Sequence, residues 1–113
     1  MVIVGVGADI ESIARFRNLP YKENKPFYRK IFTKKELEYC TAKADPYPHF
    51  AARFCAKEAG LKALGRATDL KNIEIIYKSG TPRLRINGCQ DLKIFASLSH
   101  AKDWALAFVI LTI

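Results

Sequence analysis

The segment Phe54–Lys62 (FCAKEAGLK) restricts how this chain can fold more than any other feature of the sequence. At the spacing of an α-helix, Phe50, Phe54 and Leu61 form one narrow apolar stripe. Glu58 lies at the margin of this stripe, and Lys62 follows it one turn later. A carboxylate at the edge of a core is partly desolvated, so we expect a cation beside it. An ordinary surface Glu–Lys pair, worth about 0.3 kcal/mol, explains Glu58 and Lys62 when they are taken alone.

Asp9 is a second carboxylate at an unusual position. The apolar run Val2–Ala8 predicts a buried strand, and Asp9 stands where this strand stops. Gly5 and Gly7 share a face of the strand with Asp9, so a ligand or another backbone could approach closely there. Asp9 could equally cap the turn that follows. Together with Glu58, however, it makes two carboxylates that each border an apolar element, and this favours a site.

The chain is strongly basic, with 19 Lys and Arg residues against 11 Asp and Glu residues and a net charge of +8. This charge predicts an acidic partner: a nucleic acid, an anionic membrane surface, a phosphorylated small molecule or an acidic protein. The three cysteines, Cys40, Cys55 and Cys89, show no CxxC spacing. We therefore expect reduced thiols in a cytoplasmic protein, with Cys55 in the core.

Residues 1–113 have the length of a single domain, and half of them are hydrophobic, which is enough for a modest core. The N-terminal apolar run has no basic region before it, so we expect no signal peptide. The apolar run Trp104–Ile113 is about half the length that a membrane-spanning helix needs. We therefore expect no membrane partner.

The order of the predicted elements indicates the fold class. A strand comes first, three helical segments follow, and strands with a period of two complete the chain. Thr33 and Glu36 have the spacing of a capping box, and Gly65 is a good C-terminal cap. The expected segments are a strand over 2–8, helices over 11–19, 33–43 and 48–64, a polar loop over 21–26, and strands over 73–78, 83–86, 94–99 and 104–112. We predict an α+β domain with a mainly antiparallel sheet and helices packed on one of its faces.

Asp9 and Glu58 together predict a magnesium site. Both carry hard oxygen ligands, and Arg53, Lys57 and Lys62 place positive charge around Glu58. Such a pair suits a Mg²⁺ ion that is completed by water and substrate phosphates. The sequence has no cluster of Cys and His residues for zinc and no GxxxxGK[ST] loop for a Walker-type nucleotide site.

Ser99 and His100 are adjacent, which suggests a Ser–His nucleophile pair. Adjacent residues of a strand point to opposite faces, so these two are poorly placed to act on each other. A hydroxyl and an imidazole at the end of a strand suit phosphate binding better. A simply exposed histidine at a turn is the commoner alternative.

Two motifs resemble those of the phosphopantetheinyl transferases. Val6–Asp9 is similar to their first motif, in which an aspartate follows hydrophobic-Gly-hydrophobic. Phe54–Lys62 is similar to their second, an aromatic residue followed by x-x-Lys-Glu-Ala-x-x-Lys. The length of the chain and three further segments resemble the small holo-acyl-carrier-protein synthase branch; these segments are Arg15–Phe16, Phe32–Leu37 and Ser97–His100. The paired motifs are specific at this separation, and the match covers nearly the whole chain.

The resemblance implies a 4′-phosphopantetheinyl transferase-like fold and a reaction. The family moves the 4′-phosphopantetheine arm of coenzyme A to a serine of apo acyl carrier protein and releases adenosine 3′,5′-bisphosphate. Asp9 and Glu58 match the Mg²⁺ ligands of the family. Glu58, directly or through a bound water, would help to deprotonate the serine. Lys62 would neutralise the leaving phosphate.

The resemblance also implies residues that bind the two substrates. Arg53, Ser99 and His100 match positions near the coenzyme A phosphates. Arg15 lies on the helix with which the family grips the acidic carrier protein, and this partner accounts for the charge of +8. The carrier can belong to fatty acid biosynthesis or to secondary metabolism, and the sequence does not distinguish the two.

Two segments depart from the family pattern. Gly60 stands where the family has a large apolar or aromatic residue, so we expect looser packing and a cost of about 1 kcal/mol in helix propensity. The segment 65–70 is shorter and poorer in glycine than the loop that the family places near the nucleotide, which leaves the nucleotide contacts of this segment open.

The strand Trp104–Leu111 is apolar on both faces and needs cover on both sides. The helical segments can cover only one side of the sheet, so the other side predicts an interface. The resemblance implies a homotrimer with coenzyme A bound between subunits. We expect Asp9 and Glu58 from one chain and His100 from the next to form each site.

Two other interpretations remain. A small basic RNA-binding protein fits the charge and the interleaved aromatic residues Tyr21, Phe27, Tyr28 and Tyr39. No RNP, KH or zinc-finger pattern supports it, and it leaves the two carboxylates unexplained. The third interpretation is an inactive structural relative that keeps the fold.

Overall fold

The main sheet contains three antiparallel strands in the order β1-β5-β4, and β2 and β3 form a separate antiparallel hairpin. The computed structural model describes residues 1–113. Its strands are β1 (Ile3–Ser12), β2 (Ile73–Lys78), β3 (Thr81–Ile86), β4 (Lys93–His100) and β5 (Trp104–Thr112). Its helices are α1 (Ile13–Arg17), α2 (Lys25–Ile31), α3 (Lys34–Thr41) and α4 (Tyr47–Leu64), with short 3₁₀ helices η1 (Tyr21–Glu23) and η2 (Leu70–Asn72).

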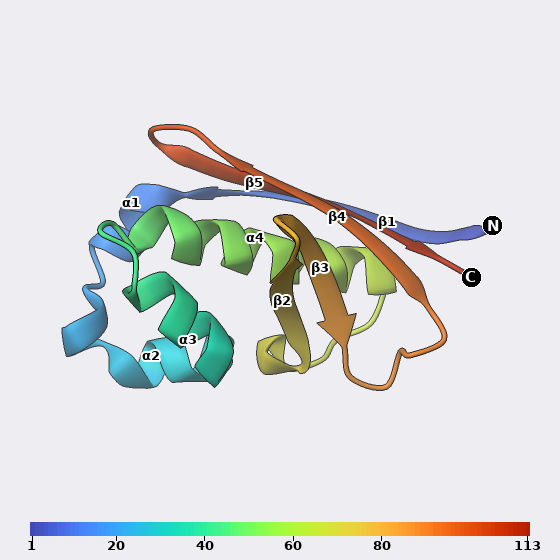
Figure 1. Ribbon diagram of the computed structural model, residues 1–113, viewed down its shortest axis with the longest axis horizontal. Coiled ribbons are helices and arrows are strands. Elements are labelled where there is room, and N and C mark those ends of the chain that lie inside the picture. Colours follow the sequence, from blue (N-terminus) through green and yellow to red (C-terminus); the bar gives the residue numbers. More distant parts are fainter.

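The helix α4 lies at the centre of the molecule (Figure 1). The main sheet covers one side of α4, and α2, α3 and the β2–β3 hairpin lie on the other side. The predicted α+β class is confirmed, with the strands divided between two sheets. No helix, α4 included, combines the length and the apolar character that crossing a membrane requires.

Gly5 and Gly7 allow β1 to lie directly on α4. A Cβ atom on Gly7 would be 1.9 Å from the Ala59 carbonyl oxygen, and one on Gly5 would be 2.0 Å from the Ala63 carbonyl oxygen. The two glycines predict that a ligand or another backbone approaches β1 closely, and in the structure the backbone of α4 does so. It fixes the part of β1 that carries Asp9 against the middle of α4.

Two predicted helix ends are confirmed. The Thr33 hydroxyl accepts a hydrogen bond from the Glu36 backbone N–H, and the Glu36 carboxylate accepts one from the Thr33 backbone N–H, which completes the capping box of α3. The helix α4 ends at Leu64, and Gly65 has a φ of +73°, in the left-handed region that favours glycine. These boundaries therefore follow from the local sequence.

The strand expected over 2–8 continues through Asp9 to Ser12 as β1, and two further predicted segments also differ from the structure. The helix expected over 11–19 begins only at Ile13, because Glu11 and Ser12 pair with β5 as the last residues of β1. The polar loop expected over 21–26 contains η1 and the start of α2. In both places, contacts with distant elements outweigh the local pattern.

The main sheet has one covered face and one open face. Residues of β5 that face α4 are buried, and the alternate residues are exposed. We call the exposed side the open face; its large apolar side chains are Val4, Val6, Ile10, Phe95, Trp104, Leu106 and Phe108. No element of the chain lies on this side of the sheet (Figure 1).

Candidate active site

The C-terminal half of β1 and the C-terminal half of α4 bring Asp9, Glu58 and Lys62 together. The Lys62 ammonium donates hydrogen bonds to Oδ1 of Asp9 (3.1 Å) and to the Ala8 carbonyl oxygen (2.9 Å). Asp9, Glu58 and Lys62 all lie close enough to Glu11 for their charges to affect its pKa. Three predicted site residues therefore meet where β1 lies on α4.

Lys62 does not form the surface pair with Glu58 that helical spacing alone suggests. Its side chain, which is 56% exposed, crosses to Asp9 instead. No ion pair joins Glu58 to a cation of the chain. The Glu58 carboxylate is therefore available to a ligand or to a proton.

The surroundings of the Asp9 carboxylate show whether a metal ion would fit there. Its Oδ2 atom is buried and has no hydrogen-bond partner. A buried carboxylate oxygen without a partner is costly, so a group from outside the chain fits there. No cluster of three or more His, Cys, Asp and Glu side chains is arranged for a metal ion. Asp9 and Glu58 offer the one or two carboxylates that Mg²⁺ commonly takes when water and phosphate fill its other positions.

Glu11 is a third carboxylate near this place, and it was not predicted from the sequence. Burial raises the pKa of Glu11, and the charge of Asp9 acts in the same direction, while Arg15 opposes them. Glu11 was expected in a helix, where it would not share a face with Asp9. If the predicted strand had extended to Ser12, Glu11 would have been two residues after Asp9 and on the same face of the strand.

Lys57 does not contribute the positive charge that the sequence predicted around Glu58. Its ammonium lies 2.7 Å from Oε1 of Glu36, with both side chains fully buried. It also donates hydrogen bonds to the carbonyl oxygens of Leu70 (3.0 Å) and Ile73. Burial lowers the pKa of Lys57, against the opposing charge of Glu36. The expectation was wrong because Lys57 faces α3 and β2, not β1.

Arg53 and His100 belong to a second cluster, at the N-terminal half of α4. The Arg53 guanidinium lies 4.0 Å from the centre of the Tyr39 ring. The His49 ring lies 6.0 Å from the Tyr39 ring and 5.9 Å from the His100 ring. Burial lowers the pKa of His49, and the positive charges of Arg53 and Lys43 add to this effect. His49 was not predicted from the sequence, and the phosphate-binding roles of Arg53 and His100 stay predictions.

Ser99 and His100 point to opposite faces of β4, as the alternation of a strand requires. His100 pairs with Ala105, which is buried against α4. Ser99 pairs with Leu106, which belongs to the open face. Within one chain, Ser99 is therefore on the opposite side of the sheet from Asp9.

Arg15 lies at the rim of the carboxylate site. Its Nη1 atom donates a hydrogen bond to Oε1 of Glu11 (3.0 Å). Its guanidinium also lies 5.2 Å from the centre of the Phe54 ring, and Phe54 precedes Glu58 by one turn of α4. The residue expected to bind the carrier protein is thus next to the carboxylates.

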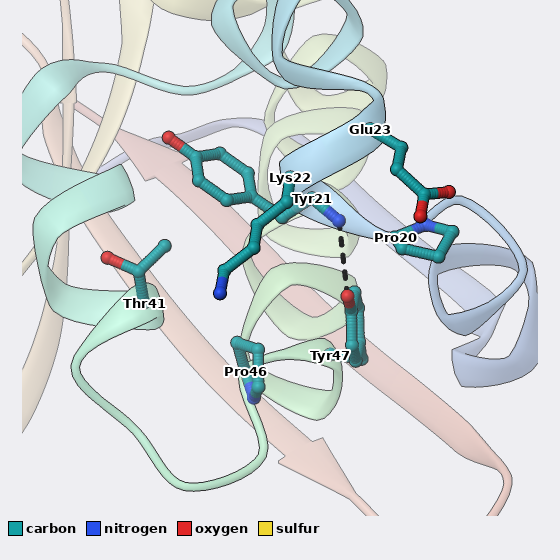
Figure 2. A pocket seen from close by; sticks show the side chains of 7 residues that line it. All are labelled: Pro20, Tyr21, Lys22, Glu23, Thr41, Pro46 and Tyr47. Atoms are coloured by element: carbon teal, nitrogen blue, oxygen red, sulfur yellow. Dashed lines mark hydrogen bonds between the residues drawn. The ribbon is translucent and has the colours of Figure 1, made fainter.

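A cavity of about 290 Å³ lies elsewhere, between η1 and the connection from α3 to α4 (Figure 2). The Tyr47 hydroxyl accepts a hydrogen bond from the Tyr21 backbone N–H (3.1 Å) at its wall. The residues that line it are Pro20, Tyr21, Lys22, Glu23, Thr41, Pro46 and Tyr47. None of them is a predicted site residue, so this cavity is separate from the carboxylate site.

Comparison with known proteins gives concordant matches. A family model described as the 4′-phosphopantetheinyl transferase superfamily matches residues 5–109. The holo-[acyl-carrier-protein] synthase of Thermodesulfovibrio yellowstonii is 44% identical, over 98% of this chain and 100% of its own length. The crystal structure of the holo-[acyl-carrier-protein] synthase from Neisseria meningitidis has a TM-score of 0.87 at 30% identity, and the match covers 99% of this chain and 100% of that one. The enzyme from Bacillus anthracis, solved in complex with coenzyme A (3′,5′-ADP), has a TM-score of 0.86 at 29% identity, with 98% and 97% covered.

Proposed function

The chain belongs to the 4′-phosphopantetheinyl transferase superfamily, and from this membership we propose that it transfers the 4′-phosphopantetheine arm of coenzyme A to a serine of apo acyl carrier protein. The second product is adenosine 3′,5′-bisphosphate. One observation carries the proposal: Asp9, Glu58 and Lys62 meet where β1 lies on α4, and a carboxylate oxygen there has no partner within the chain.

Asp9 and Glu58 would hold a Mg²⁺ ion. When bound, the ion would neutralise charge on the pyrophosphate and make the phosphorus easier to attack. Asp9 is prepared for this role because Lys62 fixes one carboxylate oxygen and leaves the other unpaired.

Glu58 accepts the proton of the serine hydroxyl, directly or through a water molecule, since its carboxylate has no ion-pair partner. The serine oxygen then bonds to the phosphorus that carries the pantetheine arm. The bond from this phosphorus to the bridging oxygen breaks, and adenosine 3′,5′-bisphosphate leaves. Lys62, held beside Asp9 with its charge exposed, stabilises the leaving phosphate.

Arg15 binds the acidic carrier protein. It lies beside the carboxylate site and more than half of its side chain is exposed. The net charge of +8 adds a general attraction for an acidic partner. Such attraction weakens with added salt, because the screening length is about 8 Å at physiological ionic strength.

The chain forms a homotrimer whose sites each use two subunits. Two features support this: the open face is a large apolar surface that one chain leaves uncovered, and Ser99 is on that face while Asp9 is on the other. Arg53 and His100 form a separate cluster within one chain. In the trimer, Ser99, His100 and Arg53 bind coenzyme A phosphates beside the carboxylates of a neighbouring subunit.

Mass measurement in solution tests the oligomer, and a stable, active monomer contradicts it. A sharper test refolds Asp9→Ala together with His100→Ala. If each site uses both residues from different chains, some mixed trimers hold an intact site and activity returns in the mixture. If trimers form and no activity returns, the site lies within one chain.

The transfer itself is tested by incubating the protein with coenzyme A, Mg²⁺ and apo acyl carrier protein and measuring the release of adenosine 3′,5′-bisphosphate. Release that requires the carrier supports the proposal, and no release contradicts it.

The RNA-binding interpretation has no support among the relatives. To separate the two interpretations, the melting temperature is measured with each ligand. We expect coenzyme A with Mg²⁺ to shift it and single-stranded RNA to leave it unchanged.

We propose that the reaction takes place in the cytoplasm. All three cysteines are free thiols and buried, as expected where thiols are kept reduced. Imaging of a fluorescent fusion tests this location.

A further inference from the structure

Glu11 lies beside Asp9 and Glu58, and its ion-pair partner is Arg15, with 3.0 Å between Oε1 and Nη1. The Glu11 side chain is only 16% exposed, because it lies at the end of β1 on the face that meets α4. The Arg15 side chain is 53% exposed, and its guanidinium also lies over the ring of Phe54. A largely buried carboxylate and an aromatic ring therefore hold this guanidinium from two sides.

Arg17 shows the alternative arrangement on the same helix. Two of its nitrogens donate hydrogen bonds to the two carboxylate oxygens of Asp45, at 3.0 and 2.6 Å. Arg15 uses one nitrogen on Glu11, and its other donors have no partner within the chain. An acidic partner can therefore bind Arg15 without displacing Glu11, whereas at Arg17 it would compete with Asp45.

We propose that Glu11 is a positioning residue that holds Arg15 over Phe54, so that the acidic carrier protein docks with its serine at Glu58. This inference rests on the proposed function and adds a residue that acts through Arg15. Phe54 and Glu58 are one helical turn apart, so a carrier carboxylate bound at Arg15 is anchored beside the proton acceptor. Without Glu11, Arg15 keeps its charge but loses its fixed direction, and ordering the side chain becomes a cost of docking.

Simple charge attraction gives the opposite expectation. Glu11 is negative, so its removal makes the docking surface more positive and should strengthen the attraction of an acidic carrier. Positioning instead requires that docking weakens when Glu11 is removed. The direction of the change in KM for the carrier therefore separates the two effects.

The experiment measures KM for apo carrier protein, KM for coenzyme A and kcat in the wild type, Glu11→Ala, Arg15→Ala and the double variant. We expect Glu11→Ala to raise KM for the carrier about fivefold, the effect of freeing one long side chain. KM for coenzyme A and kcat stay within about twofold of wild type, because Glu11 acts on docking alone. In the Arg15→Ala background, Glu11→Ala adds nothing further. Glu38→Gln removes one exposed negative charge from α3 and serves as the control, with all three constants unchanged.

A KM for the carrier that falls or stays the same in Glu11→Ala overturns the inference. A rise that persists in the Arg15→Ala background overturns it as well, and so does a fall in kcat with both KM values unchanged. Glu11→Gln keeps the size of the side chain and one acceptor oxygen, and should give a smaller rise in the same constant; it replaces Glu11→Ala if that variant does not fold. A wild-type protein without transfer activity overturns the proposed function itself, before any variant is compared.

Discussion

The helix α4 carries two lysines that pair with carboxylates in opposite ways. Lys57 and Glu36 form a buried pair, in which backbone amides and carbonyls bond the remaining polar atoms. Lys62 and Asp9 form a pair at the surface, in which one buried carboxylate oxygen has no partner. The first pair is complete within the chain, and the second leaves a position for a ligand.

The buried pair stabilises the fold, whereas the Lys62–Asp9 pair belongs to the candidate active site. Glu36 joins α3 to α4 through Lys57 and to β2 through the Ile75 backbone N–H, so its loss leaves a buried charge unpaired. The Lys62–Asp9 pair, in which the lysine side chain is more than half exposed, contributes less to stability than a fully buried pair. Substitution of the first pair should therefore change stability, and substitution of the second should change activity.

The largest expected effect is on folding at the buried pair. Glu36→Ala should lower the free energy of unfolding by about 3–5 kcal/mol, because it leaves the Lys57 ammonium buried without its counter-ion. Lys62→Met should change the same quantity by less than about 1 kcal/mol. Urea denaturation followed by circular dichroism measures both values. The double variant Glu36→Leu with Lys57→Met, which removes both charges, should recover part of the loss. Equal losses in Glu36→Ala and Lys62→Met would show that burial does not distinguish the pairs.

The next effect is on transfer at the exposed pair. Lys62→Met should lower kcat about 100-fold, the usual effect of losing one charge that stabilises a transition state. Its melting temperature should stay close to that of the wild type. The check is kcat with both substrates saturating; a fall confined to KM would assign Lys62 to binding alone.

The contact between β1 and α4 positions the Lys62–Asp9 pair, and Gly7 in this contact differs from Gly60, which faces Leu84 and Ile73 on another side of α4, in whether it can accept a Cβ atom. Gly7→Ala should cost about 1–3 kcal/mol, because its Cβ would overlap the Ala59 carbonyl oxygen and push the strand away. Gly60→Ala should stabilise the protein by about 0.5–1 kcal/mol, since its Cβ would meet the side chains of Leu84 and Ile73 at 3.4 and 3.5 Å. Thermal unfolding measures both changes. A stabilising Gly7→Ala would contradict the close approach seen in the structure.

The smallest expected effect is a dependence on pH near the buried pair. Burial alone would raise the pKa of Glu74, but hydrogen bonds from Thr33 and Arg85 outweigh it and lower the pKa below its ordinary value of 4.5. The stability that Glu74 contributes is therefore fully present above the unfolded-state value and is lost as the pH falls through the folded-state pKa. The difference in unfolding free energy between wild type and Glu74→Gln should be constant between about pH 6 and 8 and shrink below about pH 4.5. A difference that grows on acidification would reverse the assigned direction.

The sequence predicts the exposed pair's location better than its contacts. Helical spacing places Glu58 and Lys62 near the core margin, and the glycines beside Asp9 predict a close approach on that face. Together, the helical spacing and the glycines predict a site at the junction of β1 and α4. Spacing gives an angle around the helix axis, however, and does not tell which element lies at that angle. For this reason the helical spacing predicted Lys57 beside Glu58, although Lys57 pairs with Glu36 of α3.

Glu11 was missed for a related reason. Its place at the end of β1 depends on pairing with Ala105, a residue distant in the chain, and local pattern favoured a helix there. The division of the strands into two sheets is likewise decided by contacts between distant segments. In contrast, Thr33 and Gly65 act on their own neighbours, so the ends of α3 and α4 could be predicted.

The incomplete pair at the junction of β1 and α4 is the proposed Mg²⁺-dependent phosphopantetheine transfer site. The most direct test is the intact mass of apo acyl carrier protein after incubation with coenzyme A and Mg²⁺, with wild type and Asp9→Asn in parallel. Asp9→Asn keeps the size of the side chain and removes its charge. If the proposed site performs the transfer, the carrier gains the mass of one 4′-phosphopantetheine with the wild type, and gains none when a chelator is present or when Asp9→Asn replaces the wild type. No gain with the wild type, or an equal gain with Asp9→Asn, would contradict this assignment.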